Sequence, residues 1–440
     1  MTQQRKTLTQ LFVPIAFETL FFMLTGMVDT FMLSYVGDDA VGAVGTANTY
    51  ISVFIIMFNI ISSGMIAVMT QYIGAKKIGI AYQARQIGIV FNSILGILLS
   101  LFLFFFSGTL LNVIGIADGL MEYAKNYLQL VGSFCFVAAL TPIFSSYLRA
   151  FGFTKEPMAA TVSANLLNII LNSVFLFGFD MGVTGVALAT VISRLVNLIV
   201  VIILSGRLVH AKKEPDRLPT KQLLGQIIRI GLPSACETAL YNVAMTFVVR
   251  FLNQMDAEGL NATARVYAST VTNFSYCVGA SLAQANAIIT GWSIGSGDYK
   301  SCYRKTRKAA LIGVAVAAVL EALIAILAPV YMNIFTDNPE MVALVQKLLF
   351  IDIVLEIGRV SNLVYGQALK TSGDAVFPTV LAAIFMYVCA VGGTYFFGIY
   401  QGLLVVGAYI GMACDECVRA IGMYLRFRSG KWEEKGFIEK

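Results

Sequence analysis

The sequence predicts an all-α polytopic membrane protein, with twelve transmembrane helices in two pseudo-symmetric bundles of six. The composition is the first reason: 58% of the 440 residues are hydrophobic and 13% are charged, against about 25% charged in soluble domains. The second is a series of continuous apolar runs of about 20 residues, the length of a membrane-spanning helix. They do not alternate with period two, as the strands of a membrane barrel do.

Twelve such runs follow one another along the chain. They cover residues 11–36, 46–72, 87–108, 126–148, 158–178, 184–206, 230–252, 264–294, 309–333, 345–368, 376–398 and 404–425. The first run is too long and too poorly flanked for a cleaved signal peptide, so it counts as a helix.

The distribution of basic residues orients these helices. Of the 31 Lys and Arg residues, 24 lie in the two termini and the even-numbered loops, and only Lys125, Arg265 and Lys347 lie in the opposite loops. The positive-inside rule therefore predicts a multi-pass protein of the cell (inner) membrane with both termini in the cytoplasm. The net charge of +6 is explained by loops that face anionic membrane lipids, without a nucleic-acid partner. We expect the C-terminal RFRSGKWEEK to be a membrane-surface tail with a Trp anchor.

An internal repeat predicts the domain organisation. Pro14, Glu18 and Thr19 in LFVPIAFETLFF recur 219 positions later in IGLPSACETALY, as Pro233, Glu237 and Thr238. Further matches follow at offsets of 220 or 221: Gly74 with Gly295, Arg149 with Lys370, Gly152 with Gly373, and Gly182 with Gly402. Because the shift spans six helices, an even number, the repeat is parallel, with its axis along the membrane normal. We predict an N-terminal bundle at 1–205, a cytoplasmic linker at 206–229 and a C-terminal bundle at 230–440.

Motifs of enzymes and metal proteins are weak or missing in the sequence. Cys414 and Cys417 form a CxxC inside the last run, without a second pair or nearby histidines, so we predict no metal site. The single histidine, His210, lies in a basic loop. There is no HExxH and no P-loop. We therefore expect neither a cofactor nor an enzymatic activity.

Several segments resemble one transporter family in the order expected for it. They are MVDTFMLSYVGDDAVGAVGTANTY at 27–50, AVMTQYIGAK, LFIDIVLEIGRVSN, ALKTSGD and ACDECVRAIGMYLRFRSGKW. Together they resemble the bacterial-type MATE (multidrug and toxic compound extrusion) transporters over nearly the whole chain. The resemblance implies two six-helix bundles, a monomer, and export of drugs or metabolites driven by an inward Na⁺ or H⁺ gradient.

Acids inside the apolar runs are the first candidates for coupling. A charge at the centre of a transmembrane helix costs roughly 2.5–3.5 kcal/mol on insertion scales, so such residues mark functional sites by default. Glu18 and Asp29 lie ~16 Å apart along the predicted helix 11–36 but only ~20° apart in azimuth, so both face one side. The resemblance implies cation or proton coupling for Asp29 and, less closely matched in position, for Glu237. Glu18 is a further candidate, with snorkelling to the membrane surface or an ion pair with a Lys as the alternatives.

The run at 345–368 holds Asp352, Glu356 and Arg359 on one helical face. If Arg359 neutralises Glu356 in a buried pair, Asp352 remains for ion binding, which the resemblance also implies. Glu356 is kept as a second coupling candidate. Arg359 is predicted to be structural, as are three residues of the last run: Asp415, Glu416 and Arg419.

Amides form the remaining polar groups within the runs. Asn165, Asn168 and Asn172 lie on one face of the run at 158–178, and Gln284 and Asn286 lie in the run at 264–294. They are candidates for lining the substrate cavity or ligating the cation, with interhelical hydrogen bonding as the alternative. Many MATE members have Asp where Asn172 stands, so this departure favours Na⁺ over a two-aspartate proton relay.

These observations predict a cation-coupled antiporter that exports small, cationic amphiphilic drugs or metabolites by alternating access. A carboxylate that binds Na⁺ or a proton loses the charge that would hold a cationic substrate, so the two compete. One alternative is a flippase for lipid-linked sugars from the wider superfamily. The excess of intramembrane acids over bases favours cationic substrates instead. A membrane-embedded enzyme is the third alternative.

Overall fold

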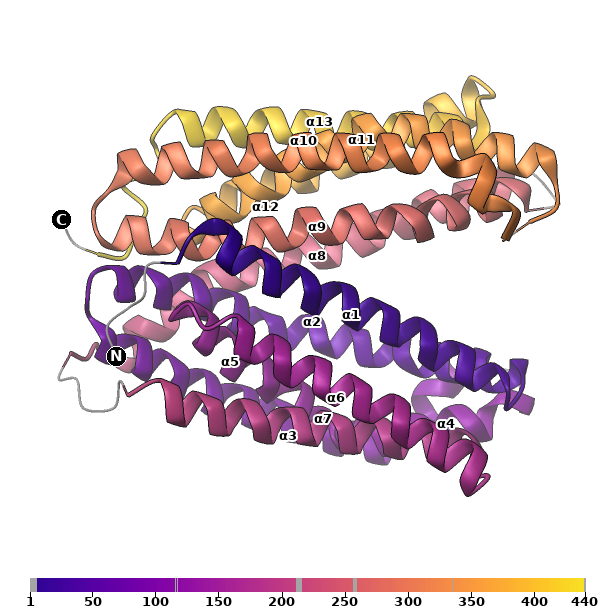
Figure 1. Ribbon diagram of the computed structural model, residues 1–440, viewed down its shortest axis with the longest axis horizontal. Coiled ribbons are helices and arrows are strands. Elements are labelled where there is room, and N and C mark those ends of the chain that lie inside the picture. The colour runs from indigo at the N-terminus through magenta and orange to yellow at the C-terminus, as the bar shows by residue number, and fades with distance from the viewer. Residues whose placement is uncertain are drawn as a thin grey trace. The chain divides into compact units, whose positions relative to one another are not determined.

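The computed structural model describes residues 6–114, 116, 118–210, 216–255, 259–334 and 336–438. Within these ranges the chain forms helices and no strand, which confirms the all-α fold class (Figure 1). The chain divides into two compact units, Met1–Ala235 and Cys236–Lys440, and the boundary falls inside one long helix, α8 (Thr220–Met255).

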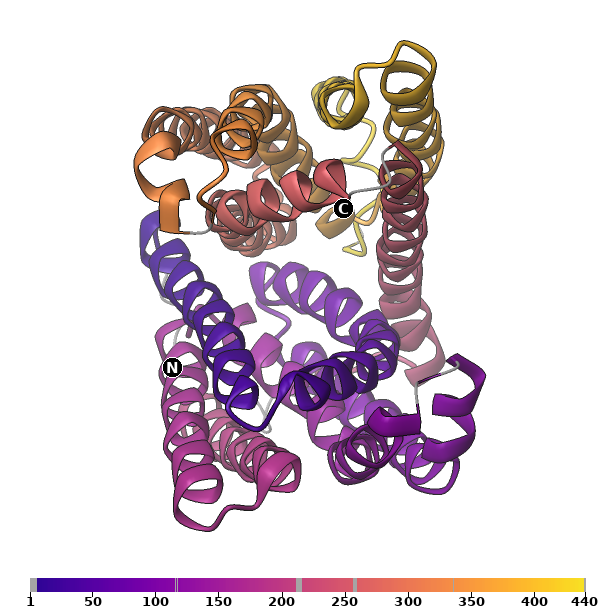
Figure 2. The same ribbon diagram turned by 90° about the vertical axis from the view of Figure 1, so that its right-hand side faces the viewer.

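The first unit is a bundle of helices that run side by side, seen lengthwise in Figure 1 and end-on in Figure 2. Its elements before α8 are α1 (Leu8–Ser34), α2 (Asp38–Gly74), α3 (Ile78–Ile114), α4 (Asp118–Ser133), α5 (Cys135–Ala150), α6 (Lys155–Ser173) with a π-helical turn η1 (Val174–Gly178), and α7 (Gly182–Leu208). The predicted span 126–148 is the pair α4 and α5, which bends by 45°. Apolar side chains of α1 to α7 form the core of this bundle.

The second unit is a bundle of the same kind. After α8 it contains α9 (Leu260–Gly295), α10 (Tyr299–Tyr331), η3 (Met332–Ile334), α11 (Pro339–Thr371), α12 (Val376–Phe385) with the π-helical segments η4 (Met386–Val391) and η5 (Thr394–Tyr400), and α13 (Leu404–Arg428). Its core is built from apolar residues of α8 to α11, η3, η4 and α13.

Every predicted apolar run lies within these helices. By length and hydropathy alone, seven of the described helices could cross a membrane, or eight if the bent pair α4 and α5 is one span. The other four predicted spans lie in α8, α9, α11 and α13, which are long enough but more polar. In α11 and α13 the charged side chains are mostly buried within the unit, so they lower the hydropathy without facing lipid.

The helix after the predicted linker starts earlier than the sequence suggested. α7 ends at Leu208 and α8 begins at Thr220, inside the predicted linker 206–229, of which 211–215 lie outside the described residues. The added turns carry Leu223 and Ile227, both fully buried. These side chains continue an apolar face at i, i+4 spacing, which explains why the helix extends this far.

This early part of α8 crosses α2 at two glycines. A Cβ atom on Gly231 would lie 1.7 Å from the carbonyl oxygen of Ile60, and one on Gly64 would lie 2.0 Å from that of Ile227. The two backbones therefore touch directly, which is the kind of close approach that small residues permit between membrane helices.

α5 and α11 end in the same kind of backbone turn. Gly152 and Gly373 both have positive φ angles, 89° and 96°. Their N–H groups donate to the carbonyls of Arg149 at 2.9 Å and Lys370 at 3.0 Å. Because only glycine adopts such angles without strain, the matched glycines predicted from the repeat end equivalent helices in the two units.

The prediction of a surface Trp anchor in the C-terminal tail is wrong. Trp432 is 1% exposed, its indole N–H donates to the carbonyl of Phe427 at 2.7 Å, and its ring stacks on that of Phe427 at 4.8 Å. The chain reverses at Gly430, which has a φ of 71°, and this reversal returns the indole to the second unit.

The glycine crossing gives a direct test of how the first unit packs. We expect Gly231→Ala to lower the free energy of unfolding by about 1–3 kcal/mol, because the added methyl group displaces the α2 backbone. Thermal unfolding of the purified protein in detergent measures this. The control is Gly225→Ala on the same helix, where nothing lies within 4 Å of the new Cβ. Equal unfolding midpoints for the two variants would contradict the crossing.

Candidate functional site

One acid of the first unit is held by a basic partner. Arg149 Nη2 lies 2.7 Å from Glu18 Oε2, and the Thr161 hydroxyl donates to Glu18 Oε1 at 3.0 Å. The side chains of Glu18 and Arg149 are 11% and 16% exposed. Glu18 is therefore neutralised by a group at the end of α5, in an ion pair as one alternative in the sequence analysis held, although with Arg rather than Lys.

The same ion pair recurs in the second unit between the repeat-matched residues. Lys370 Nζ lies 2.8 Å from Glu237 Oε2. Both bases stand in the last turn of their helices, α5 and α11. Glu18 and Glu237, which match in the repeat, thus pair with Arg149 and Lys370, which also match. These ion pairs explain both acids by a structural role.

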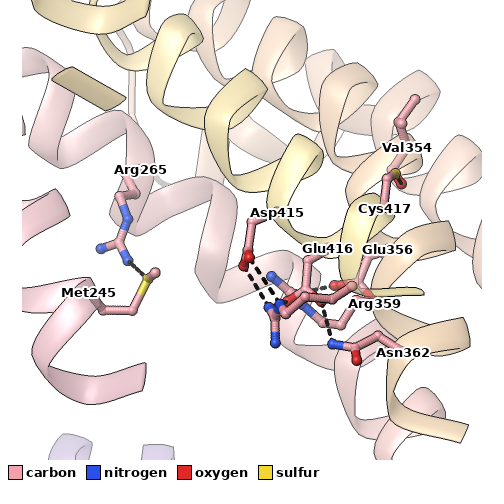
Figure 3. A network of polar contacts seen from close by, with 10 residues as sticks. Met245, Arg265, Val354, Glu356, Arg359, Asn362, Asp415, Glu416 and Cys417 are labelled. Atoms are coloured by element: carbon pink, nitrogen blue, oxygen red, sulfur yellow. Dashed lines mark hydrogen bonds and ion pairs between the residues drawn. The ribbon is translucent and has the colours of Figure 1, made fainter. Parts of the chain in front are cut away.

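A larger network of charges joins α11 to α13 (Figure 3). Arg359 forms an ion pair with Glu356 on its own helix, and its Nε lies 3.4 Å from Glu416 Oε1 on α13. Asn362 donates from Nδ2 to Glu416 Oε2 at 2.9 Å. In Figure 3 these side chains converge between the two helices. Glu356, proposed from the sequence as a coupling residue, is thus placed against arginine.

Arg419 completes this network from α13. Its Nη2 lies 2.6 Å from Asp415 Oδ2 and 2.9 Å from Glu416 Oε1, and its Nε donates to Asp415 Oδ1 at 3.0 Å. One guanidinium therefore holds both acids. The geometry has the form of the structural ion pairs predicted for the last run.

Asp29 has a different environment. Asn172 Nδ2 donates to Asp29 Oδ1 at 2.8 Å and to Asn168 Oδ1 at 3.3 Å. Among the described residues no Lys or Arg nitrogen comes within ion-pair distance of Asp29. Arg194 of α7 acts on it only from farther away. Asp29 is partly buried and relies on an amide for its hydrogen bond.

The contacts of α1 agree with the predicted common face of its two acids. Glu18 meets Thr161 and Asp29 meets Asn172, both at a separation of 143 residues. A constant separation means that α1 and α6 run parallel and that both acids of α1 point at the same neighbour.

Asp352 on α11 also lacks a basic partner. It is 2% exposed, and its Oδ2 makes no hydrogen bond within the described part of the chain. Arg359 and Glu416 act on it electrostatically, but neither forms an ion pair or a hydrogen bond with it. Of the acids predicted for coupling in the second unit, Asp352 is the one left uncompensated at close range.

Glu321 on α10 is a buried acid that the sequence analysis missed. It is 0% exposed. Neither carboxylate oxygen has hydrogen-bond geometry with a described residue, although the Ser275 hydroxyl lies nearby. Asp352, Glu356 and Arg359 act on it electrostatically. Its signal was present in the sequence, since Glu321 is a single acid within the apolar run LIGVAVAAVLEALIAILAPV.

Acids outnumber bases in one interacting, largely buried group of side chains on α10, α11 and α13, although these helices carry further Lys and Arg residues outside the group. The five carboxyl groups belong to Glu321, Asp352, Glu356, Asp415 and Glu416, and the two guanidinium groups to Arg359 and Arg419. If all seven were charged, three negative charges would remain uncompensated among them. Burying uncompensated charge is costly, so the acids of this group without an arginine partner are the candidates for binding a proton or a cation.

The other predicted amides differ in their surroundings. Asn286 on α9 is buried and donates to the Thr306 hydroxyl of α10 at 3.4 Å, a contact between helices. Gln284 is half-buried on α9. Asn165 is half-buried on α6, and its Nδ2 finds no hydrogen-bond partner among the described residues.

The described residues contain no group of three or more His, Cys, Asp or Glu side chains placed to hold a metal ion. A bound cation would therefore take one or two carboxylates, with neutral oxygens as the remaining ligands. Asn172 carries one such oxygen: its Oδ1 is buried and makes no hydrogen bond to a described residue, while Nδ2 of the same amide contacts Asp29.

Comparison with known proteins gives the same repeat independently. The family model described as MatE matches the chain twice, over residues 14–174 and 233–396. The two matches start 219 positions apart, at the prolines with which the sequence repeat begins.

Individual proteins resemble the chain over nearly its whole length. "Uncharacterized transporter YisQ" of Bacillus subtilis is 34% identical over 429 residues, covering 96% of this chain and 94% of that protein. "Probable multidrug resistance protein NorM" of Thermotoga maritima is 26% identical, covering 99% of this chain and 95% of that protein. A solved structure, described as the outward-facing conformation of a multidrug resistance MATE family transporter, has a TM-score of 0.87 at 22% identity. It covers 96% of this chain and 94% of that one, and so shares the fold.

The repeated ion pairs can be tested by stability measurements. We expect Glu18→Gln and Arg149→Met each to lower the unfolding midpoint, because removing one partner of a buried pair costs roughly 3–5 kcal/mol. The double variant should recover part of this loss, since it leaves no unpaired charge. Exposed Lys155→Gln is the control. Strictly additive losses in a double-mutant cycle would show that the two residues do not interact.

Proposed function

Because the chain belongs to the MATE family of membrane transporters, we propose that it is a cation-coupled antiporter that exports small, cationic amphiphilic molecules. The observation that carries the proposal is the division of its intramembrane acids into two classes. Glu18, Glu237 and Glu356 have basic partners, whereas Asp29, Asp352 and Glu321 have no ion-pair partner among the described residues.

The unpaired acids supply a physical mechanism for exchange. A charged carboxylate in a low-dielectric site attracts a cation strongly, and it loses that attraction when it binds a proton or a metal ion. A coupling ion and a cationic substrate then compete for the same negative charge. Each shifts the equilibrium between inward and outward states only by its differential affinity for them. A membrane potential of 100 mV adds about 2.3 kcal/mol per charge moved.

Within this proposal Na⁺ fits the surroundings of Asp29 better than a proton relay does. Hard cations prefer oxygen ligands. At the position where the family resemblance implies an acid, this chain has the amide Asn172, whose Oδ1 is buried without a hydrogen-bond partner among the described residues. Asn168 Oδ1 lies beside it. One carboxylate with neighbouring amide oxygens suits a monovalent cation, whereas a relay would need a second titratable group.

The orientation belongs to the proposal as well. The basic loops favour an orientation with both termini in the cytoplasm. We further propose that the protein is a monomer in the inner membrane, as the family resemblance implies. The coupling ion would then enter from outside, down its gradient, and the substrate would leave in the opposite direction.

Flux measurements on proteoliposomes test the proposal. An imposed Na⁺ gradient and an imposed pH gradient should be applied separately, with ethidium as the transported dye. We expect the parent to export the dye when the Na⁺ gradient is applied. Asp29→Asn and Asp352→Asn should each lower the export rate about ten-fold or more, which corresponds to a free-energy change of about 1.4 kcal/mol. Glu321→Gln should also reduce it, because that acid belongs to the same uncompensated set. The matched control is Glu122→Gln, an exposed acid on α4.

Two results would count against this proposal. If both Asp29→Asn and Asp352→Asn exported the dye at the parental rate, these carboxylates would not be required for coupling. If neither gradient moved any cationic dye, the alternative of a lipid-linked flippase would be favoured.

A further inference from the structure

A cavity of about 490 Å³ lies in the first unit, where α3 meets the chain that leads into α8. This volume is within the range of small-molecule sites. We call it the linker groove, and its lining is used below in two parts. The polar part consists of Tyr82, Gln83, Gln86, Arg217 and Thr220, and the apolar part of Ile87, Val90, Phe91, Ile94 and Leu224, with Gly79 at one end.

The polar end of the linker groove is firmly built. Gln83 Nε2 donates to the carbonyl of Leu218 at 2.6 Å, and the Leu218 N–H donates back to Gln83 Oε1 at 3.0 Å. One side chain thus fixes the backbone between Arg217 and the start of α8. Arg217 itself is exposed and forms no ion pair with a carboxylate of the described residues. α8 starts at Thr220, which also lines the groove.

The apolar end follows one face of α3. Ile87, Val90 and Ile94 stand at helical spacings of three and four residues, and from Tyr82 to Ile94 the helix rises ~18 Å. This is slightly more than half of a hydrocarbon core of about 30 Å, which is the depth of one leaflet. Val90 and Ile94 are 59% and 57% exposed, so the groove is open along this face.

We propose that the linker groove binds an anionic glycerophospholipid of the cytoplasmic leaflet. Its phosphate would lie at Arg217 and the first turn of α8, and an acyl chain would follow Ile87, Val90 and Ile94. The assignment to the cytoplasmic leaflet rests on the orientation given in the proposed function. The binding of lipid itself needs no transport activity.

Charge and shape together favour this occupant. Arg217 is the one charged residue in the lining, and a guanidinium without a carboxylate partner attracts a phosphate and repels a cationic amphiphile. An anionic leaflet supplies such phosphates at the level of juxtamembrane basic residues. A free phosphate would leave the apolar track empty. A bound lipid would touch both α3 and α8, so it would brace the segment that leads into α8.

The test uses the full-length protein with Ile94→Trp, in phosphatidylcholine vesicles containing a few per cent of a lipid with brominated chains. Bromine quenches Trp fluorescence on contact. We expect brominated phosphatidylglycerol to quench at an about five-fold lower mole fraction than brominated phosphatidylcholine, the equivalent of about 1 kcal/mol for one basic residue. The parent, with its own Trp292 and Trp432, gives the background. Adding Arg217→Gln should abolish the preference, whereas Arg207→Gln, a basic residue outside the groove, should not.

The remaining outcomes each overturn the proposal. Equal quenching by the two lipids would mean ordinary contact with bulk lipid. Loss of the preference on adding glycerol 3-phosphate would mean a site for the free phosphate group. Relief of quenching by ethidium would make the groove a route for cationic substrates. Native mass spectrometry of the parent and of Arg217→Gln, counting bound phosphatidylglycerol, checks the result without the added Trp. Unchanged lipid counts in Arg217→Gln would overturn it as well.

Discussion

The cost of placing a carboxylate in hydrocarbon governs the arrangement of polar residues in this protein. A charged acid at the centre of a membrane helix has to be paired, or it has to bind a proton or a cation. Glu18, Glu237 and Glu356 are paired with basic side chains. Asp29 and Asp352 have no ion-pair partner among the described residues, so a bound cation would stabilise their charged forms.

The repeat matches two of the paired acids with each other and matches none of the unpaired acids. The paired acids Glu18 and Glu237 occupy matched positions, and so do their partners. The unpaired acids have no acidic counterpart at offsets of 219 to 221. Those offsets from Asp29 reach Val248, Val249 and Arg250, those from Asp352 reach Val131, Gly132 and Ser133, and those from Glu321 reach Ser100, Leu101 and Phe102. Glu18 and Glu237 are thus both paired and matched by the repeat, whereas Glu356 is paired without an acidic counterpart at these offsets.

The sequence predicted most of the fold but only part of the candidate site. Apolar runs and matched glycines located all twelve helical segments, because both signals are local. The partner of Glu18 was not predictable, since Arg149 lies 131 positions away and several bases were equally plausible from the sequence. Glu321 was not predicted although it lies inside an apolar run, because it matches neither the repeat nor a family motif. The burial of Trp432 was not predictable, because it results from a contact with Phe427 that no periodic pattern in the tail sequence indicates.

Competition between substrate and coupling cation for the unpaired acids can be measured at binding equilibrium. Purified protein in detergent would be loaded with ²²Na⁺ at constant pH and titrated with ethidium, while a weakly buffered sample of the same protein is followed for proton release. We expect the dye to displace Na⁺, and Asp29→Asn or Asp352→Asn to lower the amount displaced. Binding of the dye that releases neither Na⁺ nor protons would contradict such competition.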